Sequence, residues 1–345
     1  MEEKIIVRNS RPEDADRIGE IFDINWTAIN LNYKSLIGDE LYDVYYGDLK
    51  TRMEGNVKMI KERSLDSATC FVTEVDGVVA AFATYRTDVK NGVKIGIVGF
   101  NACDPAFKGR GIAGKQYARI YDEMRKVGCV AAQVHTGLDN LHAPARRAYE
   151  KSGFEKFLPD VNYFMMLKPE LAVYNGRPTD ENIVVREVKP SDKDRLMEIT
   201  RQQWTIINEN YKACIGDDLY AIFYGSVEQG VTSVQSAIVE RMEAPERFLV
   251  TEVDGVVAGY ATYRVVDSYG YKCGIVGYNA VDNNFKGRGI AGRQYALIYK
   301  KMMEEGCVSA KVHTGLDEKH APARRAYEKS GFEKNLPDVN YFMML

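Results

Sequence analysis

Glycines and basic residues gather in one short segment that could hold a phosphate group. The segment spans residues 104–115, between an expected strand and an expected helix, and it recurs with few changes at residues 282–293. Glycines let backbone N–H groups approach a ligand closely, and a helix N-terminus adds roughly half a positive charge. We therefore expect both loops to cradle a pyrophosphate. A merely flexible turn between strand and helix is the alternative.

The same glycines also fit a dinucleotide-binding pattern. Gly109, Gly111 and Gly114 satisfy G-x-G-x-x-G, which alone is a weak signal. In a dinucleotide-binding domain this pattern follows the first strand of a βαβ unit almost directly, whereas here several expected strands and two expected helices come first. The order of elements argues against a nicotinamide-dependent oxidoreductase, which stays an alternative.

Histidines and a tyrosine mark a second pair of segments. Residues 142–154 recur unchanged at residues 320–332, and the only other histidines, His135 and His313, form a second duplicated pair. Histidine has a pKa near 6.5 in water and could take a proton from an ammonium group. A hydrogen-bonded structural histidine is the alternative. Since no carboxylate lies between residues 96 and 103, deprotonation could also run through water.

Together these segments resemble the GNAT superfamily of N-acetyltransferases. Residues 108–113 resemble its motif A, (Gln/Arg)-x-x-Gly-x-(Gly/Ala), with a lysine at the first position that keeps the positive charge, and residues 286–291 repeat the motif. The segment that ends in Tyr-x-x-x-Gly-Phe resembles motif B. The resemblance implies transfer of an acetyl group from acetyl-CoA (coenzyme A), the acyl donor, directly to a primary amine.

The resemblance also implies how the cofactor is held. Backbone amides of the glycine loops would bind the pyrophosphate, and the strand edge before each loop would pair with the pantetheine arm. The expected cofactor-binding residues of the first repeat are Asn101, Ala102, Cys103, Lys108, Gly109, Arg110, Gly111, Ile112, Ala113 and Gly114. Their copies are Asn279, Ala280, Val281, Lys286, Gly287, Arg288, Gly289, Ile290, Ala291 and Gly292. The change from Cys103 to Val281 excludes Cys103 as a nucleophile common to both repeats.

For catalysis, the resemblance points to Tyr149 and Tyr327. In the family, the tyrosine before Gly-Phe often lies near the thioester and protonates the departing thiolate, and general acid catalysis is worth about 10²- to 10⁴-fold. The alternative is an aromatic packing residue on an amphipathic helix. Seven residues earlier the family commonly has asparagine, whereas this chain has His142 and His320.

The acceptor site is expected on the helices that follow the first strand of each repeat, because these usually form one wall of it in this family. Aromatic faces and a carboxylate there would suit a cation. The residues concerned are Trp26, Tyr33, Asp39 and Tyr42, with the copies Trp204, Tyr211, Asp217 and Tyr220. Ordinary core packing is the alternative. We expect a small-molecule amine as substrate; an amino acid, a polyamine, an aminoglycoside-like antibiotic and a protein amine all stay open.

The elements that must position these residues come in two copies. A shift of 178 positions places Val72 on Val250, and about 71 of the 98 positions from residue 70 to 167 are then identical. A period of this length indicates two whole domains. We expect an N-terminal GNAT-like acyltransferase domain at residues 1–167, a linker at 168–181 and a C-terminal copy at 182–345. The copies differ most at 48–69 against 226–247 and at 87–91 against 265–269.

Within one repeat, the pattern predicts the element order β-α-α-β-β-β-α-β-α-β-β. Asp76 and Gly77 between two β-rich runs predict a hairpin, and Gly128 predicts the end of the helix that starts at Gly111. A final pair of strands is expected at residues 154–158 and 161–167. These elements predict an α+β fold, with two tandem domains that each form a mixed, mostly antiparallel sheet flanked by helices.

The composition excludes several classes of protein. With 45% apolar and 28% charged residues and a formal net charge of -3, it is typical of a soluble globular protein and gives no sign of nucleic-acid binding. No stretch approaches the roughly 20 apolar residues of a membrane helix, and the acidic start is unlike a signal peptide. We therefore expect a cytoplasmic protein with no membrane partner. The six cysteines contain no CxxC pair, so neither a metal site nor a disulfide framework is expected.

Three functional hypotheses follow from the sequence. The first is an N-acetyltransferase in which both halves are competent, since loops and tyrosines are intact in both. The second is an enzyme with one catalytic and one structural half. The third is a non-enzymatic acyl-CoA-binding sensor, because an obvious general base is missing. Fusion of two like domains often replaces a dimer, so we expect a monomer with an internal pseudo-dimer.

Overall fold

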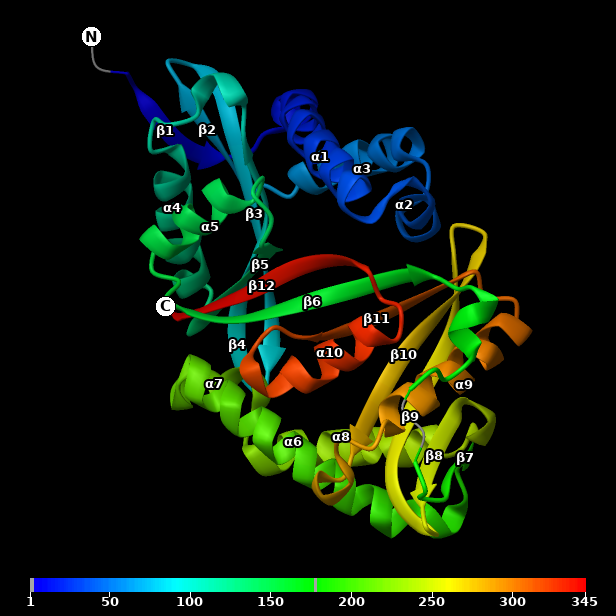
Figure 1. Cartoon of the computed structure of the whole chain (residues 1–345). Coiled ribbons are helices and arrows are strands. Elements are labelled where there is room, and N and C mark those ends of the chain that lie inside the picture. Colours follow the sequence, from blue (N-terminus) through cyan, green and yellow to red (C-terminus); the bar gives the residue numbers. More distant parts are fainter. Residues whose placement is uncertain (1–2, 177–178) are drawn as a thin grey trace.

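A computed structural model describes residues 3–176 and 179–345. The first two residues of the expected N-terminal domain and two residues of the expected linker lie outside the described residues. In the described part, twelve strands form one continuous sheet in the order β1-β2-β3-β4-β5-β12-β6-β11-β10-β9-β8-β7, with helices on both faces (Figure 1). Counted outward from the centre, corresponding strands of the two repeats follow one another in the same order on both sides.

The elements of the two repeats correspond one to one. The strands of the first repeat are β1 (Ile5–Asn9), β2 (Cys70–Val75), β3 (Val78–Lys90), β4 (Val93–Cys103), β5 (Ala131–Gly137) and β6 (Lys156–Met166). Its helices are α1 (Ala15–Ile37), α2 (Asp39–Tyr46), α3 (Leu49–Ser64), α4 (Ile112–Lys126) and α5 (Ala143–Lys151). The strands of the second repeat are β7 (Ile183–Glu187), β8 (Phe248–Val253), β9 (Val256–Ser268), β10 (Tyr271–Val281), β11 (Ser309–Gly315) and β12 (Lys334–Met344). Its helices are α6 (Lys193–Ile215), α7 (Asp217–Tyr224), α8 (Val227–Arg241), α9 (Ile290–Glu304) and α10 (Ala321–Lys329).

The predicted architecture is confirmed: the sheet is mixed and mostly antiparallel, with flanking helices. Its parallel pairs are β4 with β5 and β10 with β11. Two details of the predicted order were wrong. Three helices, not two, follow the first strand, because Gly47 adopts a φ of 76° and ends α2 before α3 begins. The last strand is continuous across Pro159, whose carbonyl accepts a hydrogen bond from the Leu316 N–H at 2.9 Å.

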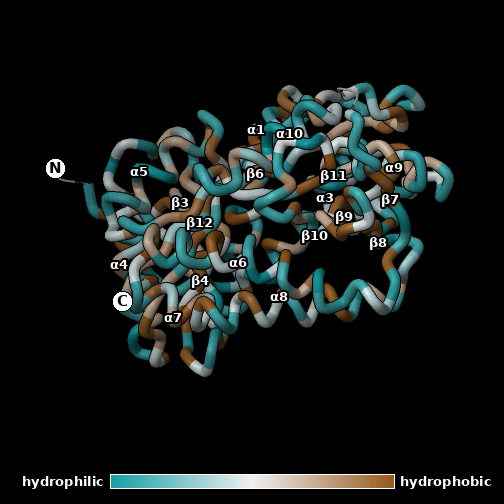
Figure 2. Tube along the Cα trace, turned by 60° about the horizontal axis from the view of Figure 1, so that its bottom comes forward, coloured by the Kyte–Doolittle hydropathy of each residue, from teal (hydrophilic) through white to brown (hydrophobic). Residues whose placement is uncertain are grey.

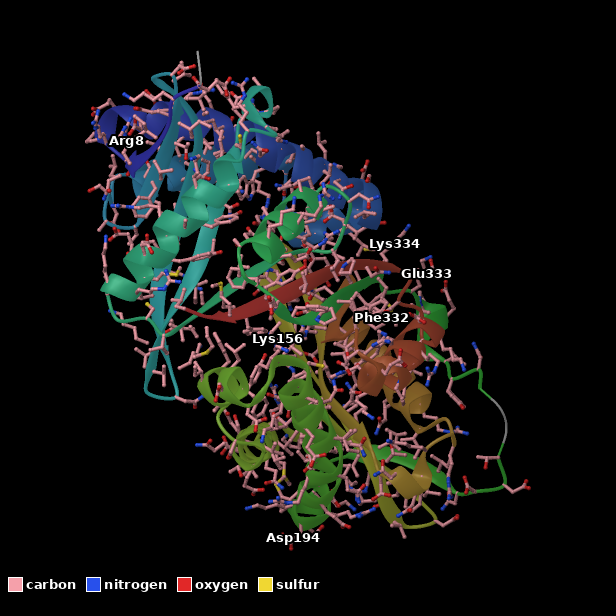
Figure 3. The ribbon with its side chains drawn as sticks, turned by 90° about the vertical axis from the view of Figure 1, so that its left-hand side faces the viewer. Arg8, Lys156, Asp194, Phe332, Glu333 and Lys334 are labelled. Atoms are coloured by element: carbon pink, nitrogen blue, oxygen red, sulfur yellow. The ribbon has the colours of Figure 1, made fainter. Side chains whose placement is uncertain are left out.

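The last strand of each repeat lies in the sheet half formed by the other repeat. Strand β12 of the second repeat pairs with β5 of the first, and β6 of the first repeat pairs with β11 of the second. The two exchanged strands also pair with each other, with Asp338 opposite Asp160. They run side by side across the middle of the molecule (Figure 1). Their first residues, Lys156 and Lys334, lie between Arg8 at one end and Asp194 at the other (Figure 3).

Both faces of the exchanged strands are covered by apolar side chains. On one face, Tyr163 of β6 packs in the core of the second repeat and donates a hydrogen bond to Glu328 at 2.8 Å, while Tyr341 of β12 does the same with Glu150 of the first repeat. On the other face, Phe164 packs under α1 and α2, and Phe342 packs under α7. Figure 2 shows hydrophobic segments along the central strands. Burial of one such aromatic side chain stabilises the fold by roughly 1.5–3 kcal/mol.

The segments in which the two copies differ take part in contacts between the halves. The amide of Asn91, in the turn between β3 and β4, donates to the Ile222 carbonyl of α7 at 3.0 Å. In the other copy, the Ser268 hydroxyl donates to the Val44 carbonyl of α2 at 2.8 Å, and the ring of Tyr269 lies against Gly47. The differences at 87–91 and 265–269 therefore make the two inter-half contacts distinct.

Two findings bear on the expectations from composition. None of the helices in residues 3–176 and 179–345 has the length and apolarity that crossing a bilayer requires. All six cysteines fall within these ranges and are free; four are buried, Cys103 is half-buried and Cys214 is exposed.

The exchange predicts that the halves stay together when the linker is cut. A protease recognition sequence inserted between the exposed residues Thr179 and Asp180 allows the chain to be cleaved there. The two fragments should co-elute in size-exclusion chromatography at the volume of the uncleaved insertion variant, because β6 and β12 remain paired. Fragments that elute separately in native buffer would show that each repeat completes its own sheet.

Candidate active site

The two glycine loops lead directly into helices α4 and α9. Gly111 and Gly289, each with a φ of 74°, are the last residues before these helices, and Gly109 and Gly287 have φ values of 84° and 83°. Glycine adopts this left-handed backbone without the steric cost that a β-carbon brings. The first N–H groups of a helix have no partner within the helix, so each loop presents backbone donors and the positive end of a helix dipole. The expected phosphate cradle therefore has suitable geometry in both copies.

In each copy, an aspartate at the start of the loop forms an ion pair with an arginine of a neighbouring helix. Asp104 accepts a hydrogen bond from the Ala106 N–H at 2.8 Å, and the Arg17 guanidinium of α1 pairs with the same carboxylate. In the second repeat, Arg195 of α6 reaches Asp282 at 2.6 Å. These ion pairs join the loop to the helix expected to line the acceptor site.

The second cradle differs from the first in that the linker lies over it. The short helix Pro169–Ala172 leads to Tyr174, whose ring lies 4.2 Å from the Arg293 guanidinium at the start of α9. A β-carbon added to Gly289 would lie 2.1 Å from the Tyr174 hydroxyl oxygen, and one added to Gly292 would lie 2.9 Å from its ring. Among the described residues, 3–176 and 179–345, β-carbons added to Gly111 and Gly114 in the first repeat would have no neighbour within 4 Å. Within this part of the chain, only the second cradle is covered.

Beside each cradle, two parallel strands separate. Residues 95–97 of β4 pair with residues 131–133 of β5, and no register continues beyond them, although β4 runs on to Cys103. On its other side, the pairing of β4 with β3 shifts between Val98 and Asn101, which marks a β-bulge. Strands β10 and β11 behave in the same way after Ile275. This wedge leaves a strand edge at Asn101, Ala102 and Cys103, where the pantetheine arm was expected.

A buried network of polar side chains holds Tyr149 beside the wedge. The Asn101 amide donates to the Tyr149 hydroxyl at 2.9 Å and accepts from the Tyr117 hydroxyl at 2.9 Å. The corresponding distances for Tyr327, Asn279 and Tyr295 are 2.8 and 3.1 Å. Burial raises the pKa of Tyr149, because it disfavours the phenolate, and the hydrogen bonds offset only part of this effect. Tyr149 therefore stays protonated at neutral pH and can act as a proton donor.

On the acceptor side, the expected residues divide into two groups. Trp26 stacks on Phe22 at 4.1 Å and packs with its core cluster, so its environment is that of core packing. Tyr33 instead stacks on His142 at 6.1 Å. In the second repeat, Tyr211 stacks on His320 at 5.9 Å. The structure thus brings Tyr33 and Tyr211 to the start of α5 and α10.

The remaining expected side chains do not form part of this arrangement. Tyr42 is fully buried and donates to the Asn30 side chain at 2.8 Å, and Tyr220 makes the same bond to Asn208 at 2.7 Å. Both are therefore core residues. Asp39 is exposed at the start of α2, where its carboxylate lies 3.9 Å from the Lys34 ammonium.

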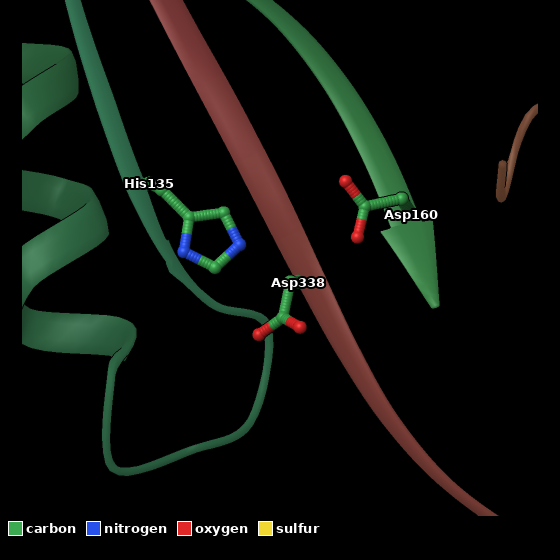
Figure 4. Close-up of side chains that lie close together, drawn as sticks. All are labelled: His135, Asp160 and Asp338. Carbon is green, nitrogen blue, oxygen red and sulfur yellow. The ribbon is translucent and has the colours of Figure 1, made fainter. Parts of the chain in front are cut away.

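The histidines His135 and His313 meet carboxylates from the exchanged strands. His313 Nε2 lies 3.1 Å from Asp160 Oδ1, and ligand atoms of His135, Asp160 and Asp338 all lie within 4.8 Å of one another. Figure 4 shows these three side chains on three neighbouring strands, β5, β12 and β6. Each histidine belongs to one repeat, whereas the carboxylate beside it in its half of the sheet comes from the other.

A single cavity of about 2180 Å³ joins these features in the second half. Its walls include the glycine loop at residues 286–292, the strand edge at Asn279, and Tyr327. The acceptor-side residues Trp204, Tyr211 and His313 line the same cavity. A donor molecule on the loop and an acceptor molecule on the opposite side would therefore meet in one space.

The comparison with known families agrees with this geometry. Residues 37–154 and 206–332 match the family described as Acetyltransferase (GNAT) family, which is more than half of the chain. The chain belongs to the GNAT acetyltransferase family. The predicted resemblance and the presence of two GNAT regions are thereby confirmed, and membership supports acetyl transfer in general. GNAT enzymes generally use acetyl-CoA.

Individual relatives are distant. A curated acetyltransferase of Pectobacterium atrosepticum is 34% identical over 89 residues, which are 26% of this chain and 59% of that relative, so the chain spans less than two thirds of it. A GCN5-related N-acetyltransferase from Sphaerobacter thermophilus has the same fold, with 16% identity, a TM-score of 0.51, and coverage of 99% of this chain and 95% of that one. A tandem GNAT protein from the clavulanic acid biosynthesis pathway gives 15% identity, a TM-score of 0.44, and coverage of 99% and 98%.

Several residues at this GNAT site were not singled out from the sequence. Tyr117 and Tyr295 recur at the same offset in both copies, and so do Asp160 and Asp338, but nothing in the repeat shows that the last strands are exchanged. Tyr174 lies in the linker and has no copy that could have marked it. Duplication could therefore have indicated the buried tyrosines and the two aspartates, but it could not have indicated Tyr174.

Removal of the Asn101 side chain should destabilise the protein. Asn101→Ala leaves the buried hydroxyls of Tyr117 and Tyr149 without their shared partner, and each unsatisfied buried group costs about 1–3 kcal/mol. We expect a loss of at least about 1 kcal/mol in the free energy of unfolding, measured by urea denaturation. Asn175→Ala, in the exposed part of the linker, is the control. An unchanged midpoint for Asn101→Ala would contradict the network.

Proposed function

We propose that the protein is an acetyl-CoA-dependent N-acetyltransferase that transfers the acetyl group directly to the primary amine of a small molecule. The observation that carries this proposal is the shared cavity of the second half, in which the glycine loop and the acceptor-side residues face one space. Family membership supports the acetyl transfer, and the wedge between the parallel strands supports the route of the pantetheine arm.

In the proposed complex, the backbone N–H groups of the glycine loops bind the pyrophosphate. Lys108 and Lys286 at the start of the motifs add positive charge. The strand edges at Asn101 and Asn279 pair with the pantetheine arm, which directs the thioester toward Tyr149 and Tyr327. The Asn101 side chain therefore has a second role, since it also fixes the hydroxyl of Tyr149.

The proposed reaction needs no acyl-enzyme. An ammonium acceptor first gives one proton to His135 or His313, and the free amine attacks the thioester carbonyl, so that a C–N bond forms and the C–S bond then breaks. The departing thiolate takes the proton of Tyr149 or Tyr327, and the tyrosine regains a proton from the nitrogen of the new amide. The net products are the acetylated amine, free CoA and one proton passed from the histidine to water.

A second candidate function has one catalytic and one structural half. The cover of Tyr174 over Gly289 and Gly292 favours it, because a pyrophosphate bound at this loop and the tyrosine side chain would occupy the same space. In this case the first half carries the turnover. The second half then contributes mainly the exchanged strand β12.

Calorimetric titration with acetyl-CoA tests the donor site and its cover. We expect one tight equivalent per chain for the unmodified protein and a second, weaker one, because Tyr174 must leave the second cradle first. Tyr174→Ala should tighten the second equivalent by about tenfold or more. Val173→Ala, an exposed neighbour in the linker, is the matched control. Two equal sites before substitution would show that Tyr174 is no obstacle, and no binding at all would overturn the proposed function.

Removal of the tyrosine hydroxyls tests the proton donors. Tyr149→Phe should lower the turnover of the first half by about 10²- to 10⁴-fold, and Tyr327→Phe should do the same for the second half. The double variant should lose nearly all turnover with an amine while it still binds acetyl-CoA. Tyr121→Phe is a suitable control, because this hydroxyl bonds Ser152 within the core. Full turnover in the double variant would exclude both tyrosines as donors.

A further inference from the structure

The strand exchange places one carboxylate of each repeat at the acceptor side of the other. Asp338 of β12 lies opposite Gly137, two residues after His135, and Asp160 of β6 lies opposite Gly315, two residues after His313. Because alternate residues of a strand share a face, both carboxylates lie on the same face as the histidines. The same face carries Phe164 and Phe342. Tyr33 packs against the cluster that contains Phe164, and Tyr211 packs against the cluster that contains Phe342.

Hydrogen bonds from the opposite exchanged strand fix both carboxylates. The Asn162 amide donates to Asp338 at 3.2 Å, and the Asn340 amide donates to Asp160 at 2.9 Å. Both groups are removed from most of the solvent, and they are direct neighbours across the β6–β12 pair. Burial and the nearby Asp160 raise the pKa of Asp338, while His135 and Asn162 lower it in part. Two like charges in this position favour the approach of a cation.

Several titratable side chains lie near Asp338. The groups that interact electrostatically with Asp338 come from several elements. They are His135, Asp160, His142, Tyr33, Tyr46 and Lys311. Lys311 lines the cavity of the second half, and burial lowers its pKa. Its counterpart in the first half is the neutral Gln133, which donates to Asn340 at 3.1 Å.

We propose that the acceptor site of each half is completed by the other repeat: Asp338, beside His135, binds the ammonium group of the acceptor in the first half, and Asp160, beside His313, does so in the second. The inference rests on the proposed function and specifies its acceptor as a cationic aliphatic amine. A carboxylate beside a histidine holds the ammonium next to the group that takes its proton, and it stabilises the imidazolium that forms.

The test compares two charge-removing variants in two backgrounds. Tyr327→Phe isolates the first half and Tyr149→Phe the second. In the Tyr327→Phe background, Asp338→Asn should raise the KM for the amine about tenfold to hundredfold and more than Asp160→Asn does; in the Tyr149→Phe background the order should reverse. The asparagines keep the size and the acceptor oxygen for the bonds from Asn162 and Asn340. Glu155→Gln, an exposed charge loss just before β6, is the matched control.

The pH profile separates binding from a structural role. Because the pKa of Asp338 is raised above the ordinary value, the carboxylate becomes protonated as the pH falls through this raised pKa, and kcat/KM for the amine falls with it. Because protonation of the histidine base also lowers kcat/KM, Asp338→Asn should make this acidic limb less steep in the Tyr327→Phe background. An unchanged slope would overturn the assignment of Asp338.

Other outcomes distinguish the inference from the proposed function. The affinity for acetyl-CoA, measured by calorimetry, should stay unchanged in both asparagine variants; a protein that binds no acetyl-CoA would instead refute the proposed function. The same rank order of Asp338→Asn and Asp160→Asn in both backgrounds would overturn the crossed assignment. One histidine and two carboxylates also suit a divalent cation, so turnover is repeated in EDTA. Loss of turnover on chelation would replace the ammonium by a metal ion and overturn the inference.

Discussion

The antiparallel pairing of β6 with β12 positions the neighbouring strands of both halves, and the candidate sites depend on these strands. Strand β5 pairs with β4 over three residues only, so its position depends on β12 at its other side. The same holds for β11, which β6 supports. The wedges that open beside β4 and β10 would lose one wall without the exchanged strands. Since these strands are buried on both faces, apolar packing from both repeats holds them in place.

Because of this strand exchange, each candidate site is built from elements of both repeats. Helices α1 and α2 of the first repeat cover Phe164, which lies in the sheet half of the second repeat, and α7 of the second covers Phe342 beside the first. The acceptor-side walls thus rest on strands from both repeats. Asp160 and Asp338 lie opposite each other on the two exchanged strands, so a change of charge at one carboxylate acts on the other.

The sequence predicted those parts of the site that depend on local chemistry. The glycine loops, the helices after them and the tyrosine beside Gly-Phe follow from residue types at short spacing, and the repeat supported each prediction twice. The exchange could not be predicted, because a strand has the same pattern whichever β5-like neighbour it joins, and a repeat makes both neighbours equivalent. The continuous β6 was missed because Pro159 suggested a break, although its carbonyl stays in the ladder. Trp26 illustrates the reverse case, in which a conspicuous aromatic residue packs in the core.

The difference between the halves arises from parts of the chain that are not duplicated or have diverged. Residues 108–114 of the first loop are identical to residues 286–292 of the second, and both tyrosines are present, so these residues do not distinguish the cradles. The linker follows β6 and must therefore start in the second half, where the exchange has placed the end of that strand. Its Tyr174 can reach the cradle of α9 for this reason, and the cover of the second cradle is a consequence of the exchange.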